Sequence, residues 1–343
     1  MALSELQQPQ TAQRIIRTSE RATLQNALQD SSPPVLIHLN ADTTWLLSLP
    51  YPPSSQPPAG RSRFNILLDP WLQGPQSDVA SWFSTQWHIV TPCIETIEEL
   101  NQILAEAEQG GASNESQYPL KCYIDVVTIS HEFTDHCHEA TLKELRRDVP
   151  VFATEKAAEL IRSWKHFSNV TTTPGFSSST KDWQRVLSVS PLPEWVGIGR
   201  VITAGNALYY HSAVMLVFRH GTKSQAVIYS PHGIKGSDLQ AVQSVDIETL
   251  ALLHGLHDVR IWMTKQLNLG ALNGLEAVRA SGARYWIATH DEIKKGGGFI
   301  APMLRRTKYT VADAVKKKTQ SLGEEAPNYN FVELGSGDGL VLA

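Results

Sequence analysis

The sequence predicts a layered α/β fold, and three observations support this prediction. From residue 35 onward, apolar segments typical of strands alternate with segments whose apolar residues recur at helical spacing. Histidines follow directly after predicted strands in both halves of the chain. The 343 residues are 42% hydrophobic and 19% charged, which is enough apolar material for a substantial core. We therefore expect one sandwich whose two halves share a site.

The first half begins with an N-terminal arm, residues 1–34, in which we expect a helix over Arg14–Gln29. A single domain follows, and its first half should cover about 35–205. Strands are expected at Val35–Leu39, Thr44–Leu49, Asn65–Leu68, Tyr123–Ser130 and Val151–Ala153. Helices are expected at Ile94–Ala107, Ala140–Arg147 and Glu155–Trp164. Five prolines between residues 50 and 60 predict a loop there.

The second half, about 206–343, repeats this rhythm. Strands are expected at Ala213–Phe218, Ala226–Tyr229 and Tyr285–Ala288, and a helix at Leu269–Ala280. Strand and helix alternation in both halves is typical of layered α/β proteins.

Charge and composition exclude several classes of function. Thirty basic against 34 acidic residues give a net charge of −4, which disfavours a nucleic-acid binder with a broad basic face. The sequence has neither an apolar run long enough to span a membrane nor a secretory signal at its start. Cys93, Cys122 and Cys137 are widely spaced and form no CxxC pair, which is typical of a reducing compartment. We expect a cytoplasmic protein without an integral membrane segment.

The strongest local signal is a cluster of histidines and acids directly after the predicted strand Tyr123–Ser130. Residues 131–138 contain three imidazoles and two carboxylates. A loop at the end of a buried strand can hold such groups rigidly, and imidazole with carboxylate is the ligand set for a divalent metal such as zinc. The alternative is a solvated loop that caps the following helix.

This cluster resembles the HxHxDH signature of the metallo-β-lactamase superfamily. His131, Asp135 and His136 match it, whereas Phe133 stands where the family has its second histidine. The resemblance implies an αββα sandwich that binds one or two metals at the ends of its strands. Because phenylalanine offers no lone pair to a metal, the departure at position 133 favours one ion over two.

The rest of the family pattern follows in order along the chain. Asp69 resembles the aspartate that orients the ligands from outside the metal's own shell. His211 resembles the isolated third ligand, with His166 a weaker rival, and His290 resembles the histidine after the last core strand. His232 stands where the family has a metal-bridging aspartate, which again favours a single ion.

The resemblance implies a ligand set that is divided between two subsites. Asp135, His136 and His290 would form the second subsite, which His232 would complete. The first subsite would keep His131 and His211, unless His232 contributes there. The implied cofactor is a divalent metal, zinc first, with manganese or iron as alternatives, and no nucleotide cofactor is expected.

The resemblance also implies a function. Segments 69–72 and 289–292 look most like the branch of sugar-phosphate lactonases and N-acyl-phosphatidylethanolamine phospholipases, and the turn around His232 is similar to that of uncharacterised fungal members. We expect a hydrolase that uses a metal-activated water on an ester, lactone, amide or phosphodiester bond of a small molecule. Asp135 would orient the water or take its proton, and His211 or His232, if not a ligand, would protonate the leaving group.

Two alternatives stay open. Phe133 and His232 favour a fold relative that has lost catalysis and binds a ligand or partner. An iron-dependent oxidoreductase would use similar ligands. Near His290, the glycines at 296–298 and the two lysines before them indicate either a cradle for an anionic group or a mobile loop. The sequence does not define the oligomeric state.

Overall fold

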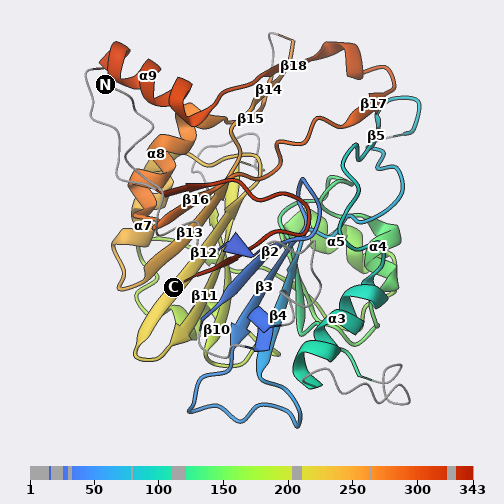
Figure 1. Ribbon diagram of the computed structural model, residues 1–343, viewed down its shortest axis with the longest axis vertical. Coiled ribbons are helices and arrows are strands. Elements are labelled where there is room, and N and C mark those ends of the chain that lie inside the picture. The colour runs from blue at the N-terminus through green and yellow to red at the C-terminus, as the bar shows by residue number, and fades with distance from the viewer. Residues whose placement is uncertain are drawn as a thin grey trace.

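The structure is a computed structural model that describes residues 15–16, 26–29, 33–78, 80–109, 121–202, 211–262, 265–322 and 330–342. These residues form four layers, in which two β-sheets face each other and helices cover both outer faces (Figure 1). This is the predicted αββα sandwich.

The first sheet has eight strands in the described part of the chain. In spatial order they are β1 (Ile15–Ile16), β20 (Gly339–Val341), β2 (Val35–His38), β3 (Trp45–Pro50), β4 (Arg63–Leu68), β6 (Val126–Ile129), β7 (Val151–Ala153) and β8 (Val170–Thr172). Strands β4, β6, β7 and β8 are parallel to one another, whereas β2, β3 and β4 are joined antiparallel. The carboxyl ends of the four parallel strands therefore meet at one edge.

The second sheet has seven described strands. In spatial order they are β19 (Asn330–Val332), β16 (Tyr285–Ile287), β13 (Glu248–His254), β12 (Lys223–Ser230), β11 (Ser212–His220), β10 (Val196–Ile202) and β9 (Gly175–Phe176). Strands β12, β13, β16 and β19 are parallel, and β11 runs antiparallel between β10 and β12. This sheet also brings several carboxyl ends to one edge.

The alternation of side chains along the strands explains the layers. In β3, Trp45, Leu47 and Leu49 point into the core between the sheets, whereas Leu46 packs against the helices outside. In β11, the even-numbered residues from 214 to 218 face the other sheet, and the odd-numbered residues from 213 to 217 pack against the outer helices. Because both faces of each sheet are covered, these strands are apolar on both sides.

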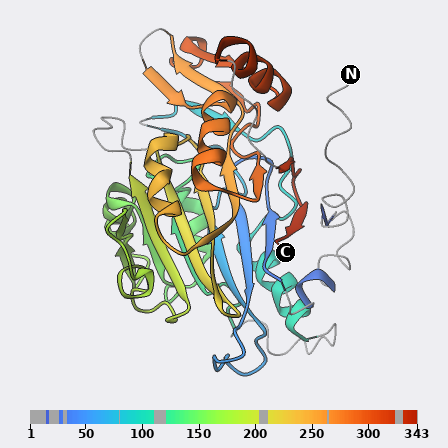
Figure 2. The same ribbon diagram turned by 90° about the vertical axis from the view of Figure 1, so that its left-hand side faces the viewer.

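Helices cover the outer faces. The first sheet carries α3 (Ile97–Gln109), α4 (Glu139–Glu144) and α5 (Glu155–Ser163). The second sheet carries α6 (Trp183–Leu187), α7 (Gly236–Gln243), α8 (Ala271–Ser281) and α9 (Val311–Leu322). Figure 2 shows α7 and α8, in orange, lying across the outside of the second sheet. Among the described residues, no helix is both long and apolar enough to cross a membrane.

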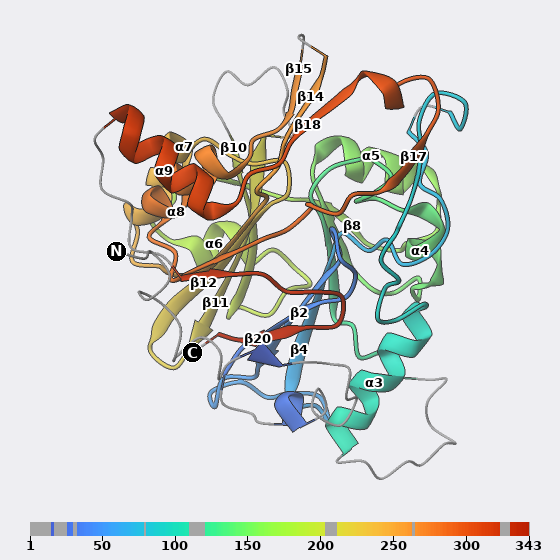
Figure 3. The same ribbon diagram turned by 45° about the horizontal axis from the view of Figure 1, so that its top comes forward.

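Two small sheets lie at one end of the sandwich (Figure 3). One pairs β5 (Thr85–Trp87) with β17 (Lys295–Gly297). The other consists of β15 (Lys265–Asn268), β14 (Asp258–Ile261) and β18 (Leu304–Thr307), and the short helix η2 (Ala301–Met303) connects the two. These strands have no counterpart among the predicted elements. They are short and partly exposed.

The predicted strands and helices of the core agree with the structure to within a few residues, but the N-terminal prediction is partly wrong. Ile15 and Ile16 are in a strand, not a helix, because they pair with Leu340 and Gly339 at the edge of the first sheet. β-Branched side chains suit such a position. Residues 26–29 are helical, and residues 17–25 of the predicted helix lie outside the described residues. Strands β9 and β10 precede residue 205 but belong to the second sheet.

Candidate metal centre

The parallel strands of both sheets deliver side chains to a common place. In the first sheet, Asp69 directly follows β4, and β6 ends just before the loop that carries His131 and His136. In the second sheet, His232 follows β12 and His290 follows β16. Carboxyl ends of parallel strands lie at the same edge, and for this reason residues more than 200 positions apart come together.

Two groups of side chains have ligand atoms close enough to hold a metal ion. The first group is His131, His136 and His232, and the second is Asp135, His136 and His290. Within each group the ligand atoms all lie within 4.8 Å of one another. His136 belongs to both groups, and all five side chains are buried. The centre is therefore compact and largely shielded from solvent.

The four imidazoles are close neighbours. The ring centroid of His131 lies 3.9 Å from that of His136 and 4.4 Å from that of His232. The ring of His290 lies 4.9 Å from His136 and 5.0 Å from His232. Four imidazoles would not pack this closely as charged groups, so the arrangement requires that most of them be neutral.

Hydrogen bonds to side-chain oxygen atoms orient three of the four imidazoles. Nδ1 of His136 donates to Asp69 Oδ2 at 2.6 Å, and Nδ1 of His232 donates to Asn268 Oδ1 at 2.8 Å. Nδ1 of His290 donates to Asp42 Oδ1 at 3.0 Å. Each bond places the remaining lone pair on Nε2, which is the usual arrangement behind metal-binding histidines.

Burial and neighbouring charges lower the pKa of three of these histidines and raise that of the fourth. Burial lowers the pKa of His131 and of His232 well below the ordinary value, and neighbouring imidazoles lower it further. Burial also lowers the pKa of His290, against the opposing effect of Asp42. For His136 burial acts in the same direction, but Asp135 and Asp69 outweigh it and raise the pKa. Three of the four imidazoles are thus held neutral by their surroundings.

A buried lysine joins two carboxylates beside the histidines. Nζ of Lys294 lies 2.6 Å from Asp42 Oδ2 and donates to Asp135 Oδ2 at 2.7 Å. Burial alone would raise the pKa of both carboxyls, but Lys294 is the largest opposing influence and holds both well below the usual range. Burial likewise disfavours the charged lysine, yet the two carboxylates raise its pKa to about 12. All three groups are therefore ionised.

The loop that carries Asp42 ties the two sheets together at the centre. Thr43 Oγ1 donates to the carbonyl oxygen of Asp135 at 2.7 Å, and the hydroxyl of Tyr229 donates to the carbonyl oxygen of Thr43 at 3.0 Å. The amide of His290 donates to the carbonyl oxygen of Asp42 at 2.9 Å. The β2–β3 connection thus positions candidate ligands that come from both sheets.

Two residues of the centre adopt left-handed backbone conformations. Asp69 has φ 41° and directly follows β4, and His290 has φ 58° and lies three residues after the end of β16. Non-glycine residues rarely adopt such angles, and when they do, they cluster at functional sites. The turn after β12 has the same character, because Gly233 has φ 82° immediately after His232.

The structure does not bring every predicted site residue into these groups. His211 lies at the correct edge, because β11 begins where β12 ends, but its Nε2 donates to the carbonyl oxygen of Leu267 at 3.0 Å. It belongs to neither metal group. The weaker rival, His166, donates to the carbonyl oxygen of Leu145 on the helical side of the first sheet. Phe133 lies against His131, with 4.9 Å between ring centroids.

A cavity of about 270 Å³ opens onto the centre. Four residues of the centre line this cavity: His232, His290, Asp135 and Lys294. Apolar side chains from the small sheets and the loops beside them line much of the rest: Phe83, Phe133, Val259, Ile261, Leu267, Ile300 and Leu304. Asp78 is also in the wall, where burial and the charge of Asp135 raise its pKa, although Thr134 donates two hydrogen bonds to it.

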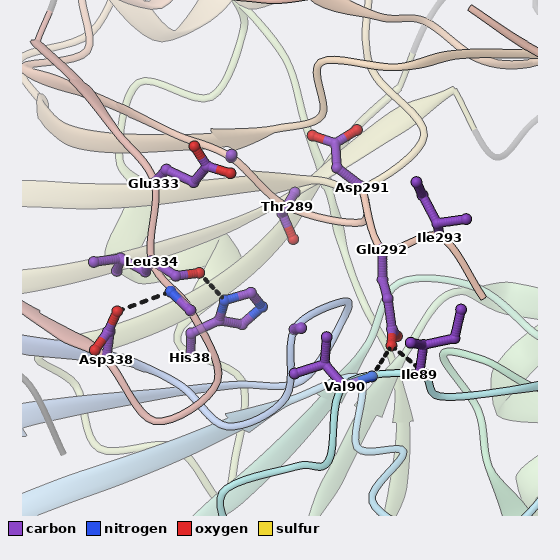
Figure 4. Close-up of a pocket in the computed structure, with 13 residues that line it drawn as sticks. His38, Ile89, Val90, Thr289, Asp291, Glu292, Ile293, Glu333, Leu334 and Asp338 are labelled. Atoms are coloured by element: carbon purple, nitrogen blue, oxygen red, sulfur yellow. Dashed lines mark hydrogen bonds between the residues drawn. The ribbon is translucent and has the colours of Figure 1, made fainter. Parts of the chain in front are cut away.

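A second and larger hollow, of about 760 Å³, is lined by the residues before and after His290 but not by His290 itself (Figure 4). Thr289, Asp291 and Glu292 face it, but none of the metal-group residues lines it. Oxygen Oε1 of Glu292 accepts hydrogen bonds from the amides of Ile89 and Val90, as Figure 4 shows. Glu292 therefore fixes this loop to the segment that contains Ile89 and Val90.

Sequence reasoning missed Asp42, Asp78 and Lys294. Asp42 lies in the short loop after the apolar strand β2, four residues beyond its end, and this signal could have been found. Lys294 was expected to belong to a glycine-rich anion cradle or a mobile loop, whereas the structure buries its ammonium between two carboxylates. Only the folded chain shows that these groups meet.

Comparisons with known proteins support the fold. The isothiocyanate hydrolase from Delia radicum gut bacteria superposes with a TM-score of 0.51 at 15% identity, covering 90% of this chain and 99% of that one. CmlA, a diiron beta-hydroxylase from Streptomyces venezuelae, superposes with a TM-score of 0.51 at 14% identity, covering 91% of this chain and 54% of that one. No family model and no curated protein matches the sequence. The fold is the αββα sandwich of the metallo-β-lactamase type, as predicted.

Proposed function

We propose that this protein is a metal-dependent hydrolase that binds one divalent ion. The observation that carries this proposal is the convergence of four buried imidazoles and one carboxylate. Three of the imidazoles are oriented by hydrogen bonds from Nδ1 to a side-chain oxygen. Nε2 of His136 is also buried without a hydrogen-bond partner among the described residues, as expected of an atom that binds a metal.

The donor set fits zinc best, with manganese or iron as alternatives. His131, His136 and His232 form a three-imidazole group, which is a common catalytic zinc set that keeps a position open for water or substrate. Asp135 and His290 lie beside this group and share His136 with it. Phe133 and His232, which depart from the two-metal pattern, support a single ion.

A bound ion would supply Lewis acidity, which acidifies a water molecule and polarises a carbonyl or phosphoryl oxygen. The chain's own residues orient the reactants. The carboxylate of Asp135 is kept ionised by Lys294, so it accepts a hydrogen bond from the attacking water and is a weak base. Asp78 has a raised pKa and faces the same cavity, which makes it the donor of a proton to the leaving group.

The cavity indicates the size and character of the substrate. A volume of about 270 Å³ accommodates a small molecule, and its mostly apolar walls favour a substrate with an apolar group next to the reacting bond. We propose an ester, lactone, amide or phosphodiester bond. The resemblance of segments 69–72 and 289–292 to one branch of the superfamily favours lactones and phosphodiesters within this set.

The proposal is tested by counting metal and measuring hydrolysis in the same preparations. The chelator-treated protein is reloaded with zinc, manganese or iron, and each metal is counted per chain by elemental analysis. His136→Ala is the most informative variant, because both metal groups contain His136. His220→Gln is the matched control, since His220 ends β11 at the opposite edge of the sheet. We expect one ion in the parent and the control, and loss of both ion and hydrolysis in His136→Ala.

A second candidate function is a binding protein that has lost catalysis. The observation that favours it is Phe133, which stands in the sequence where the family has its second histidine and whose ring lies 4.9 Å from that of His131. Under this alternative, Phe133→His together with His232→Asp should restore a stronger metal site. Absence of metal from the parent at every concentration tested would favour this candidate over the hydrolase.

A further inference from the structure

The further inference concerns Lys294, and it rests on the proposed function because it deepens the account of the same centre. The second metal group contains one anionic donor, Asp135, together with His136 and His290. Oδ2 of Asp135 faces Nε2 of His290 at 3.8 Å. The same oxygen accepts a hydrogen bond from Nζ of Lys294 at 2.7 Å. An ammonium group therefore already occupies the oxygen of Asp135 that faces His290, whereas the other oxygen, Oδ1, lies 3.6 Å from Nε2 of His136.

The fold holds this ammonium in place. Lys294 immediately precedes β17, whose pairing with β5 anchors the backbone next to it. Its side chain is only 6% exposed, and Nζ lies 5.1 Å from the ring centroid of Trp71. A second contact of 2.6 Å to Asp42 Oδ2 fixes the group from the other side. Rotation of Lys294 away from the centre would leave two buried carboxylates without their cation.

The charges lead to the same conclusion. Asp42, Asp135 and Lys294 carry one net negative charge, whereas the imidazoles of the first metal group carry none when neutral. One divalent ion among those imidazoles therefore changes the net charge of these groups from −1 to +1. A second divalent ion would lie beside the ammonium in a buried environment, where like charges repel strongly.

We propose that Lys294 is a built-in cation that takes the place of a second metal ion and so limits this centre to one bound ion. Asp42 is then a positioning residue with two tasks, because one of its oxygens holds Nδ1 of His290 and the other holds Lys294. The first metal group keeps its role as the binding site.

The test is the number of zinc ions per chain, measured by elemental analysis after equilibrium dialysis against increasing zinc. The proteins are the full chain, Lys294→Arg, Lys294→Met and the matched control Lys295→Met, whose lysine is the exposed next residue. We expect one ion in the parent, in Lys294→Arg and in the control. Lys294→Met should take up a second ion, and Asp135→Asn added to it should abolish that second uptake.

A companion variant guards against misfolding. Asp42→Asn with Lys294→Met removes one charge of each sign and keeps an amide oxygen for Nδ1 of His290, so it should fold and also take up a second ion. One ion in a folded Lys294→Met or companion variant would overturn the role of Lys294 while leaving the proposed function intact. Two ions in the parent would overturn both the role of Lys294 and the proposed single ion, but not metal-dependent hydrolysis. A parent that binds no ion would instead overturn the hydrolase proposal, and this inference with it.

Discussion

At the scale of single residues, Asp69 controls the orientation of His136. One of its oxygens accepts from Nδ1 of His136 at 2.6 Å, and the other accepts from the amide of Ser130 at 2.7 Å. Asp69→Ala should weaken zinc binding by roughly 10- to 100-fold, because the imidazole loses its fixed orientation and part of its basicity. Isothermal titration with zinc checks this, with the exposed Asp148→Ala as control. Equal affinity in the two variants would contradict the role of Asp69.

Asp78 allows a second prediction at this scale. As proton donor it should matter most when the leaving group is a poor one. Asp78→Asn should therefore lower kcat for an alkyl ester or lactone by on the order of 10²-fold, and much less for a nitrophenyl ester of the same acid. Steady-state kinetics on both substrates measures the ratio. A similar loss on both would show that Asp78 acts on structure and not on the leaving group.

The residues of the centre also show how far sequence reasoning reaches. Histidines that follow strands could be predicted as ligands, because residue type and strand context are local properties. Lys294 could not, because its role depends on Asp42 and Asp135, which lie far from it in the sequence. His211 shows the reverse case, since its position matches the pattern but its ring turns to a backbone carbonyl.

At the scale of elements, the turn after β12 is the most constrained connection to the centre. Gly233 has φ 82°, and a Cβ there would lie 2.6 Å from Cβ of Leu269. Gly233→Ala should lower the free energy of unfolding by about 2–4 kcal/mol, because strain and overlap add together. Gly221, at the other end of β12, has φ 61° with nothing within 4 Å of an added Cβ, so Gly221→Ala should cost about 1 kcal/mol.

Urea unfolding of both glycine variants measures the difference. The comparison is closely matched, because both glycines are left-handed and flank the same strand. Equal losses would mean that Leu269 moves aside without cost. A loss of zinc affinity only in Gly233→Ala would further show that the turn positions His232.

The elements that were predicted are those with strong periodicity. Strands of the core, such as β7, and helices with one apolar face, such as α5, follow directly from the spacing of their apolar residues. The small sheets were missed because β14, β15 and β18 are short, partly exposed and rich in charged residues. Their pairing comes from the tertiary structure and not from a local pattern.

At the scale of the whole molecule, buried neutral histidines should make stability depend on pH. Burial lowers the pKa of His254 to about 4, and its Nε2 accepts a hydrogen bond from Asn273, which requires the neutral form. Below the unfolded pKa of about 6.5 the unfolded chain binds a proton that the folded chain excludes. The contribution of His254 is therefore present above about pH 6.5 and is lost as the pH falls toward about 4.

His254→Gln isolates this effect. Between about pH 7 and about pH 5 the parent should lose about 2 kcal/mol more of its free energy of unfolding than the variant, since only the parent has His254 with its lowered pKa. Urea unfolding of the metal-free proteins at several pH values measures both curves. Parallel curves would contradict the assignment, because His38 and the other buried histidines remain in both proteins.

The fold class of the whole molecule could be predicted, whereas the boundary between its halves could not be read from the sequence. Alternating strands and helices indicate layers, but they do not say which sheet a strand joins. Strand β10 pairs with its successor β11 and so lies in the second sheet, and β20 pairs with β2, about 300 residues earlier, in the first sheet. The residues of a strand do not show locally which of the two sheets it joins.

The position of β20 has a consequence for biosynthesis. This strand lies between β1 and β2, so the first sheet lacks one of its inner strands until residues 339–341 have left the ribosome. Until then, the edge of β2, with its apolar residues Leu36 and Ile37, is available for pairing with other chains. The nascent chain is thus exposed to aggregation at this edge until β20 has paired, and chaperone binding at this stage would protect it.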